Sequence, residues 1–229
     1  DIASDQTFDT RVVVTTSDSD LLDNLQTEVV HGTIDGGLQV NGGSFVFVSP
    51  GTYQEDDLVA SDAVATNDIL ATGSASETII SNTEDGNTIL TVDQAVQVDG
   101  FTFDSQADDT GTDVVITDNG ATLSNGTFTG GSDYESRTAI DVQGTAEVRD
   151  SSVSGYGVGV TTNDDATISV DVTGTGDSST GIVATAASAP LIADSSVSNA
   201  GAGIQVDSTG DVEVVRSSLT GNRIGLEIT

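Results

Sequence analysis

Cysteine, tryptophan, methionine and lysine are absent from this 229-residue sequence, and proline and aromatic residues are scarce. The lack of cysteine excludes a disulfide framework, and a single histidine, His31, is too few for a zinc site. No apolar run reaches the roughly 18 residues that indicate a membrane-spanning helix. Because aromatics make up only 4% of the residues, Val, Ile, Leu, Ala and a few Phe must fill the core. That mixture favours β-strands.

Negative charge dominates what is present. There are 37 acidic residues against five arginines, giving a formal net charge of −32. Such a chain repels the phosphate backbone, which excludes direct nucleic-acid binding. In molar salt, where the Debye length falls to about 3 Å, the self-repulsion is screened and the carboxylates keep the surface hydrated. This composition resembles that of proteins from extremely halophilic archaea. A calcium-loaded surface protein is an alternative, whereas regular apolar spacing argues against an acidic disordered segment.

One pattern recurs along the chain. Its first three copies start 25 residues apart, and two further copies follow. The five copies are VDGFTFDS (98–105), LSNGTFTG (123–130), VRDSSVSG (148–155), IADSSVSN (192–199) and VVRSSLTGN (214–222). A fixed period of roughly 20–25 residues is typical of a solenoid, and short β-rich repeats indicate a β-helix.

Two ladders of apolar positions accompany the repeats. The first consists of Phe103, Phe128, Val153, Val172, Val197 and Leu219. The second consists of AIDV (139–142), GVGV (157–160), GIVA (181–184), GIQV (203–206) and GLEI (225–228), each alternating apolar with small or polar residues. The sequence therefore predicts one all-β domain over 37–229, a right-handed parallel β-helix of some eight rungs.

The segment before this domain, residues 1–36, is predicted to close its first end. TRVVVTT (10–16) favours a strand, and SDSDLLDNLQTEVVHG (17–32) favours an amphipathic helix with leucines on one face. A helix there would cover the open sheet edge of the first rung. His31 would lie at its carboxyl end and interact with the helix dipole rather than bind a metal.

Residues 50–81 resemble a known family. An apolar strand, PGTYQE (50–55), Gly73 and ETIIS (77–81) follow in the order found in the opening rungs of pectin-lyase-like β-helix proteins, and are especially similar to the start of pectin methylesterases. The resemblance implies the fold over roughly 20–229. The esterase activity would need an Asp pair, Gln side chains and an Arg from later motifs. DQAVQVDG (93–100) lies too early for the catalytic QAV element, and the other motifs are missing, so no catalytic residue is carried over.

Other carbohydrate chemistry has only generic candidates. A lyase needs a base, and the basic residues of the rungs are Arg137, Arg149, Arg216 and Arg223. We expect them to be surface arginines paired with carboxylates; Arg149 and Arg216 each follow an inward position and should face outward near a turn. A hydrolase needs paired carboxylates. Candidate pairs in loops are Asp133 with Glu135 and Asp164 with Asp165, where a solvated acidic surface explains them equally well.

Calcium is the cofactor that the acidic loops suit best. Clusters occur at QEDD (54–57), TEDG (83–86), DSQADD (104–109) and NDD (163–165), and none matches an EF-hand. The candidate ligands are Glu55, Asp56, Asp57, Asp108 and Asp109. Asn125-Gly126-Thr127 is the only N-glycosylation sequon. Asn125 also recurs as Asp150 and Asp194, three residues before each anchor, which predicts a stacked polar ladder at a turn.

The leading hypothesis is a secreted or surface-displayed halophilic protein with structural, adhesive or glycan-binding work. A carbohydrate-active enzyme (lyase, esterase or hydrolase) is the alternative, and a viral spike or fibre domain is a third. The expected partners are a polysaccharide or cell-surface glycan, or further copies of the chain stacked end to end. The start, DIASDQTF, suits a processed secreted protein or part of a longer one, and GLEIT (225–229) stops within a rung, as a truncated or end-to-end stacking chain would.

Overall fold

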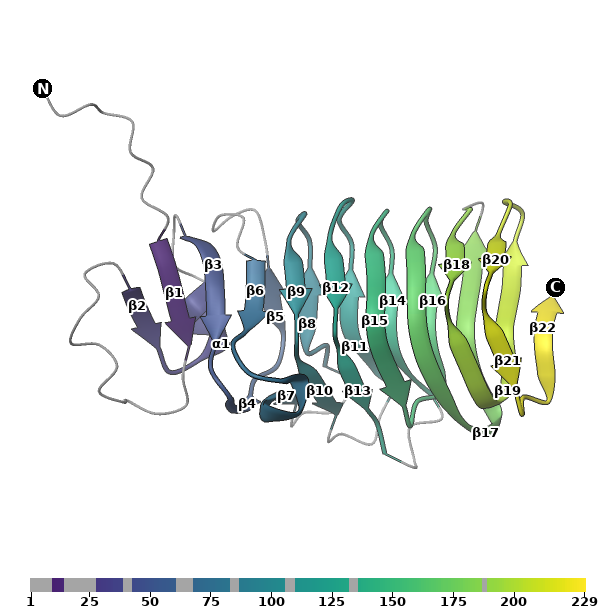
Figure 1. The fold of residues 1–229 in the computed structure, drawn as a ribbon, viewed down its shortest axis with the longest axis horizontal. Coiled ribbons are helices and arrows are strands. Elements are labelled where there is room, and N and C mark those ends of the chain that lie inside the picture. Colours follow the sequence, from purple (N-terminus) through teal and green to yellow (C-terminus); the bar gives the residue numbers. More distant parts are fainter. Residues whose placement is uncertain are drawn as a thin grey trace, which may run out of the picture.

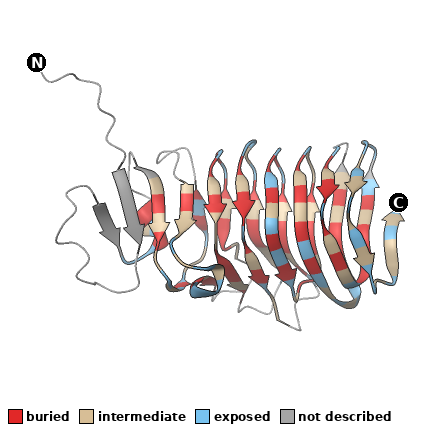
Figure 2. Cartoon of the chain, in the orientation of Figure 1, coloured by how far each residue is buried: buried red, intermediate tan, exposed pale blue. Residues whose placement is uncertain are grey.

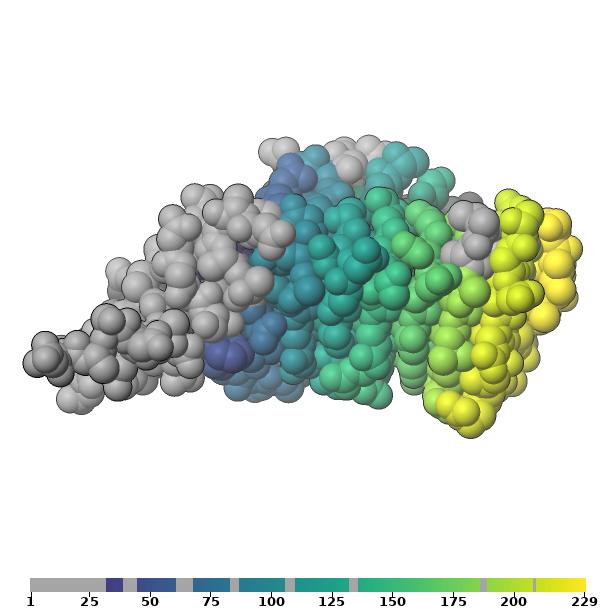
Figure 3. Space-filling model, turned by 90° about the horizontal axis from the view of Figure 1, so that it is seen from above, coloured from purple at the N-terminus to yellow at the C-terminus, as the bar shows by residue number. Residues whose placement is uncertain are grey.

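The structure is a computed structural model of the chain. It describes residues 10–14, 28–38, 43–60, 68–82, 87–105, 110–131, 136–186 and 189–229. The strands stack in parallel as a β-solenoid of about seven turns. Successive rungs follow one another along the long axis of the molecule (Figure 1), and the space-filling view shows the same order along an elongated body (Figure 3). The predicted parallel β-helix is confirmed.

Each rung contributes to three parallel faces, which we name sheets 1, 2 and 3. Sheet 1 contains β2 (Glu28–His31), β1 (Thr10–Val14), β3 (Gly43–Val48), β6 (Asp68–Ala71), β9 (Gln97–Asp99), β12 (Thr122–Ser124), the first part of β15 (Glu147–Ser154), the start of β17 (Thr167–Ala186), β18 (Leu191–Ala193) and β20 (Glu213–Val215). β1 lies between β2 and β3, so the order of the first strands along the sheet differs from their order in the chain.

The other two sheets follow the chain order throughout. Sheet 2 contains β4 (Gly51–Gln54), β7 (Thr78–Asn82), β10 (Thr102–Ser105), β13 (Thr127–Thr129), the later part of β15, the middle of β17, the start of β19 (Ser196–Ser208) and β21 (Ser218–Thr220). Sheet 3 contains β5 (Leu58–Ala60), β8 (Leu90–Val92), β11 (Gly111–Ile116), β14 (Arg137–Val142), β16 (Val158–Thr162), the ends of β17 and β19, and β22 (Ile224–Ile228).

The core is a continuous column of inward side chains, because alternate residues of every strand point to the same side. Both predicted ladders are in register: Phe103 pairs with Phe128, which pairs with Val153, and Ile140 pairs with Val160. The rings of Phe103 and Phe128 stack with centroids 4.8 Å apart. Figure 2 shows buried residues recurring from rung to rung along this column.

A short helix, α1 (Ile34–Leu38), packs against β1, β2, β3 and β5 and buries Ile34 and Leu38. It fits the predicted cap, whereas the helix predicted over 17–32 is wrong for its described end, residues 28–31. Glu28–His31 form strand β2, whose Val29 and Val30 are β-branched and pair with β1. His31 therefore ends a strand, and a role at the end of a helix is wrong. Residues 17–27 lie outside the described residues.

The remaining helical element is a short 3-10 turn, Ala75–Glu77, ahead of β7. No helix in the described part of the chain is long and apolar enough to cross a membrane.

Candidate functional site

The corner between sheets 1 and 2 is built on residues with left-handed backbone conformation. Asn125, Asp150 and Asp194 have φ values of 51°, 51° and 50°. Asn and Asp tolerate this region better than most residues because their short side chains bond locally. The predicted recurrence of a polar residue at this turn is thus confirmed. Arg216 occupies the same place one rung later, with φ 49°.

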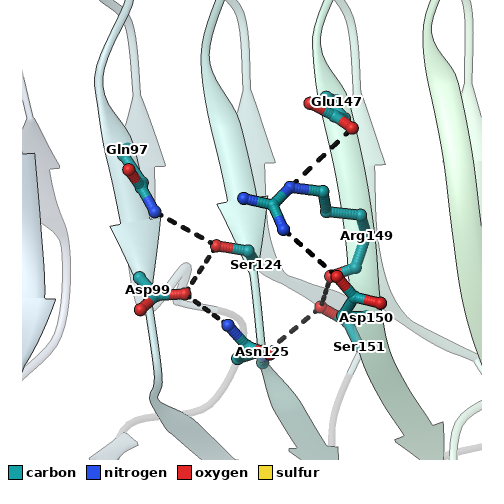
Figure 4. Close-up of polar contacts among 9 residues, drawn as sticks. Gln97, Asp99, Ser124, Asn125, Glu147, Arg149, Asp150 and Ser151 are labelled. Atoms are coloured by element: carbon teal, nitrogen blue, oxygen red, sulfur yellow. Dashed lines mark hydrogen bonds and ion pairs between the residues drawn. The ribbon is translucent and has the colours of Figure 1, made fainter.

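A hydrogen-bonded network covers the outer face of sheet 1 beside this corner (Figure 4). Oδ1 of Asp99 accepts bonds from Ser124 Oγ at 2.6 Å and from Asn125 Nδ2 at 2.7 Å. Gln97 Nε2 donates to Ser124 Oγ at 3.5 Å. Residues from two neighbouring rungs are therefore tied together across the sheet surface.

Arg149 continues the network on the next rung. Its Nε lies 3.7 Å from Glu147 Oε1, and its Nη1 lies 3.1 Å from Asp150 Oδ2. The side chain faces outward and is 38% exposed. Further along the same corner, Arg216 binds Asp194 through two contacts of 2.7 Å. This pairing raises the pKa of Arg216 and lowers that of Asp194. Both arginines are paired surface residues, as predicted.

One rung turns this corner with a residue fewer than its neighbours. The inward residues Val148 and Val153 pair with Ile168 and Val172, and the register shifts between them. The shorter corner has no residue with positive φ. A hollow of about 270 Å³ lies there, between the corners of the flanking rungs. Its lining consists of Asp150, Ser151, Ser152, Ser169, Val170, Asp171 and Asp194.

The hollow brings three aspartates to one place, which the sequence repeats did not predict. Its signal in the sequence is the spacing of the inward residues, since Ile168 and Val172 are four residues apart whereas Val148 and Val153 are five apart. Nevertheless, among the described residues there is no group of three or more acidic or histidine side chains arranged to hold a metal ion.

The predicted calcium ligands do not gather into one described site. Glu55 lies after β4, and its two carboxylate oxygens accept bonds from the backbone N–H groups of Ile34 at 2.7 Å and Asp35 at 2.8 Å. This carboxylate therefore caps α1. Asp57 occupies a turn with φ 53°, next to Asp56. Asp108 and Asp109 lie outside the described residues, as do the acidic clusters at 83–86 and 106–109.

The other predicted site residues are separate from one another. Asn125 is exposed, and its amide is bonded to Asp99; its glycosylation stays a prediction. Asp164 and Asp165 lie between β16 and β17, where each accepts a backbone N–H bond, from Asp165 at 2.8 Å and from Ala189 at 2.7 Å. Asp133 and Glu135 lie outside the described residues. Arg223 is exposed.

Arg137 is the exception among the arginines, and its predicted place on the surface is wrong. It is fully buried, with Nε 2.6 Å from Oδ1 of the equally buried Asp113. Nη2 donates to the carbonyl of Asn87 at 2.9 Å, and the hydroxyl of Tyr156 donates to Asp113 Oδ2. The expectation that the arginines of the rungs pair with carboxylates at the surface fails here because the carboxylate partner of Arg137, Asp113, is itself buried.

Burial dominates the electrostatics of this cluster. It raises the pKa of Asp113 above its usual range, although Arg137 and Tyr156 favour the ionised form. Burial and the nearby Asp113 carboxylate raise the pKa of Tyr156 well above its usual value. A signal for the pair was present in the sequence: an acid in GTDVVI (111–116) and a base in RTAIDV (137–142) occupy neighbouring rungs.

Comparisons of this chain with protein-family models, with curated proteins and with solved structures return no match. The function is therefore inferred from the sequence and the geometry of this chain. The outer surface presents ordered polar side chains on a rigid frame, and the polar groups of sheet 1 bond largely to one another.

Proposed function

We propose that the protein is a structural or adhesive module, secreted or displayed at a cell surface in a high-salt environment, and that it binds glycans. The observation that carries the proposal is the in-register stacking of about seven turns around one apolar column. Such a solenoid holds side chains of successive rungs at a fixed spacing of about 4.8 Å. A surface of that kind suits a repetitive partner better than a small compact one.

The network of sheet 1 supports a structural role for that face. Asp99, Ser124 and Asn125 direct their polar atoms to one another, and Arg149 is paired with Glu147 and Asp150. Bonds that link one rung to the next hold the side chains in place. The net charge of −32 supports a high-salt setting, because the screening of molar salt relieves the repulsion that such a charge produces.

A carbohydrate-active enzyme is the second candidate, and a specific observation favours it. Arg149 lies with Asp150 and Glu147 on one outer face, which also carries Asp99 two strands away. Asp150 and Asp171 line the hollow next to this face. Carboxylates beside an arginine are the groups that polysaccharide lyases and hydrolases use. The resemblance of residues 50–81 to pectin-lyase-like proteins points in the same direction.

One experiment separates the two. The purified chain is incubated in 3 M NaCl, with and without calcium, with polygalacturonate, cellulose and chitin, and both retention and released products are measured. Retention without turnover is the expected result. Turnover that disappears in Asp99→Asn and Arg149→Gln would establish the enzyme instead. A chain that neither binds nor cleaves any of the three polymers contradicts the glycan-binding proposal.

A further inference from the structure

The outer face of sheet 2 carries two parallel rows of short polar side chains. They flank the inward column that includes Phe128 and Val153, so both rows point outward. One row is Thr102, Thr127, Ser152, Asp171, Ser196 and Ser218; the other is Asp104, Thr129, Ser154, Thr173, Ser198 and Thr220. Except for Asp104 and Asp171, every member is a serine or a threonine. The recurring S/T-apolar-S/T pattern of the repeats produces this array.

The hydroxyls of the array are available to a ligand. Thr102 Oγ1 donates to the carbonyl of Ala75 at 2.8 Å. None of the other hydroxyls in the two rows has a hydrogen-bond partner among the described residues. The side chains of Thr129, Ser154 and Thr173 are exposed and lie on consecutive rungs. This contrasts with sheet 1, where the polar groups are bonded to one another.

The spacing of the array is regular in two directions. Neighbours in a row are about 4.8 Å apart, and the two rows, two residues apart on each strand, are separated by roughly 6.6 Å. Each hydroxyl both donates and accepts a hydrogen bond. An extended polysaccharide offers the same kind of group at regular intervals, so a chain lying across the rungs could be bound at many equivalent points.

The charge and polarity of the face narrow the choice of partner. In a chain of net charge −32, carboxylates occupy only the Asp104 and Asp171 positions of the two rows. Neither row contains an arginine, so a polyanion would form no ion pair with the rows and would meet the two carboxylates at close range, where salt screens least. From Thr102 onward the two rows also lack the large apolar side chains that form the centre of protein interfaces; Ile79, half-buried one rung before Thr102, is the apolar residue that precedes them. The exposed large hydrophobic residues of the described chain, Val59, Leu226 and Ile228, are all on sheet 3.

We propose that the outer face of sheet 2 binds a neutral polysaccharide laid across the rungs. The hydroxyls of both rows would bind it, including Thr129 and Thr173 of the second row. This inference rests on the proposed glycan-binding function and assigns it to a face and a class of ligand. Each neutral hydrogen bond to a solvated hydroxyl is weak. Binding should therefore depend on many rungs acting together, and affinity should rise with the length of the polysaccharide.

The test compares matched variants of two faces in the full chain. Thr129→Val with Thr173→Val removes two hydroxyls from sheet 2, and Thr91→Val with Thr161→Val removes two from the outer face of sheet 3. Thr91 and Thr161 are outward residues of β8 and β16, each between buried neighbours. Valine keeps the β-branched shape in all four places. Far-ultraviolet dichroism and thermal midpoints verify that both variants fold.

Retention on cellulose and on chitin is measured in 3 M NaCl, with polygalacturonate as the charged polymer. We expect the sheet 2 variant to bind the neutral polymers about tenfold more weakly, the sheet 3 variant to bind like the unaltered chain, and polygalacturonate not to bind. Equal binding by both variants, or equal loss in both, overturns the inference while leaving the glycan-binding function intact. If the unaltered chain binds neither neutral polymer, the inference falls, and binding of polygalacturonate alone would then preserve the proposed function.

Discussion

Asp113 and Arg137 form an ion pair in the interior of the solenoid, where both side chains are fully buried. Removing two charges from water is costly, so such a pair persists only when hydrogen bonds satisfy the remaining polar atoms. Tyr156 and the carbonyl of Asn87 supply bonds of that kind, and Nη1 of Arg137 is the atom of the pair left without a bond among the described residues. Arg137 and Asp113 belong to adjacent strands of sheet 3, β14 and β11. The pair therefore contributes to holding these two rungs in register.

Replacing Arg137 by methionine should lower the free energy of unfolding by about 3–5 kcal/mol, because Asp113 loses its counter-charge in a buried site. Burial already raises the pKa of Asp113. A raised folded-state pKa means that the ionised carboxylate opposes folding, so the deficit of the variant should grow as the pH rises through that pKa and shrink as the pH falls. Denaturant unfolding in molar salt at several pH values measures this.

Arg149→Met is the matched control. Its ion pairs are exposed, so the loss should be about 1 kcal/mol or less. Equal losses in the two variants would contradict the difference that we assign to burial.

At the scale of single residues, the sequence predicted that Arg149 faces outward because it follows Val148, whose inward direction the repeats define. Arg216 lies outside because it occupies the corner position of Asp150 and Asp194. Arg137 is the first residue of β14, and Asp113 directly precedes the inward Val114. Alternation along these strands therefore does not reveal that both side chains are buried. The αL corner residues were predictable from residue type at Asn125, Asp150 and Asp194. The hydroxyl rows of sheet 2 were contained in the repeats, but only the register of neighbouring strands reveals them as two continuous rows.

At the scale of single elements, the strands were predicted from the sequence more accurately than the helix. Strands with a full repeat were predicted well, since apolar positions recur at each rung and pair there. The predicted helix is wrong over its described end: the leucines of 21–25 have helical spacing, but strand pairing with β1 decides Glu28–His31. Local propensity is a weak guide where tertiary contacts compete. α1 itself is short and glycine-containing, IDGGL, and lacks a strong helical pattern.

Glu55 provides an explanation for the stability of so short a helix. Glu55→Ala removes both acceptors of the first N–H groups of α1 and should cost about 1 kcal/mol. Hydrogen exchange of residues 33–38 should accelerate before that of the inner rungs. Gln54→Ala, an exposed neighbour, should leave the exchange unchanged. A calcium-dependent rise in the thermal midpoint that Glu55→Ala abolishes would instead assign Glu55 to the predicted calcium site.

The whole molecule combines an apolar column with an acidic surface. The column holds the rungs together, while 37 acidic side chains against five arginines repel one another across a solenoid of about seven turns. The balance between these two contributions depends on ionic strength, because only the second is screened. A fold that is stable in concentrated salt is therefore expected to weaken on dilution.

Raising NaCl from 0.1 M to 3 M should increase the thermal midpoint measured by far-ultraviolet dichroism, with much of the increase complete by about 1 M, where the Debye length is about 3 Å. Lowering the pH toward 4.5 in dilute buffer should also stabilise the fold by neutralising carboxylates. An unchanged spectrum and midpoint after dialysis into dilute buffer would show that the acidic surface does not require salt.

The in-register parallel pairing also has a consequence for how the chain acquires its structure. Strands of sheets 2 and 3 pair with the strands one rung before and one rung after, so each new rung can form on the edge of a completed one at a modest cost in loop closure. During synthesis, earlier rungs could serve as templates for later ones as they leave the ribosome. The first strands break this order, since β1 must insert between β2 and β3. Their final arrangement therefore has to wait until β3 is available, and nucleation is expected in the regular rungs beyond it.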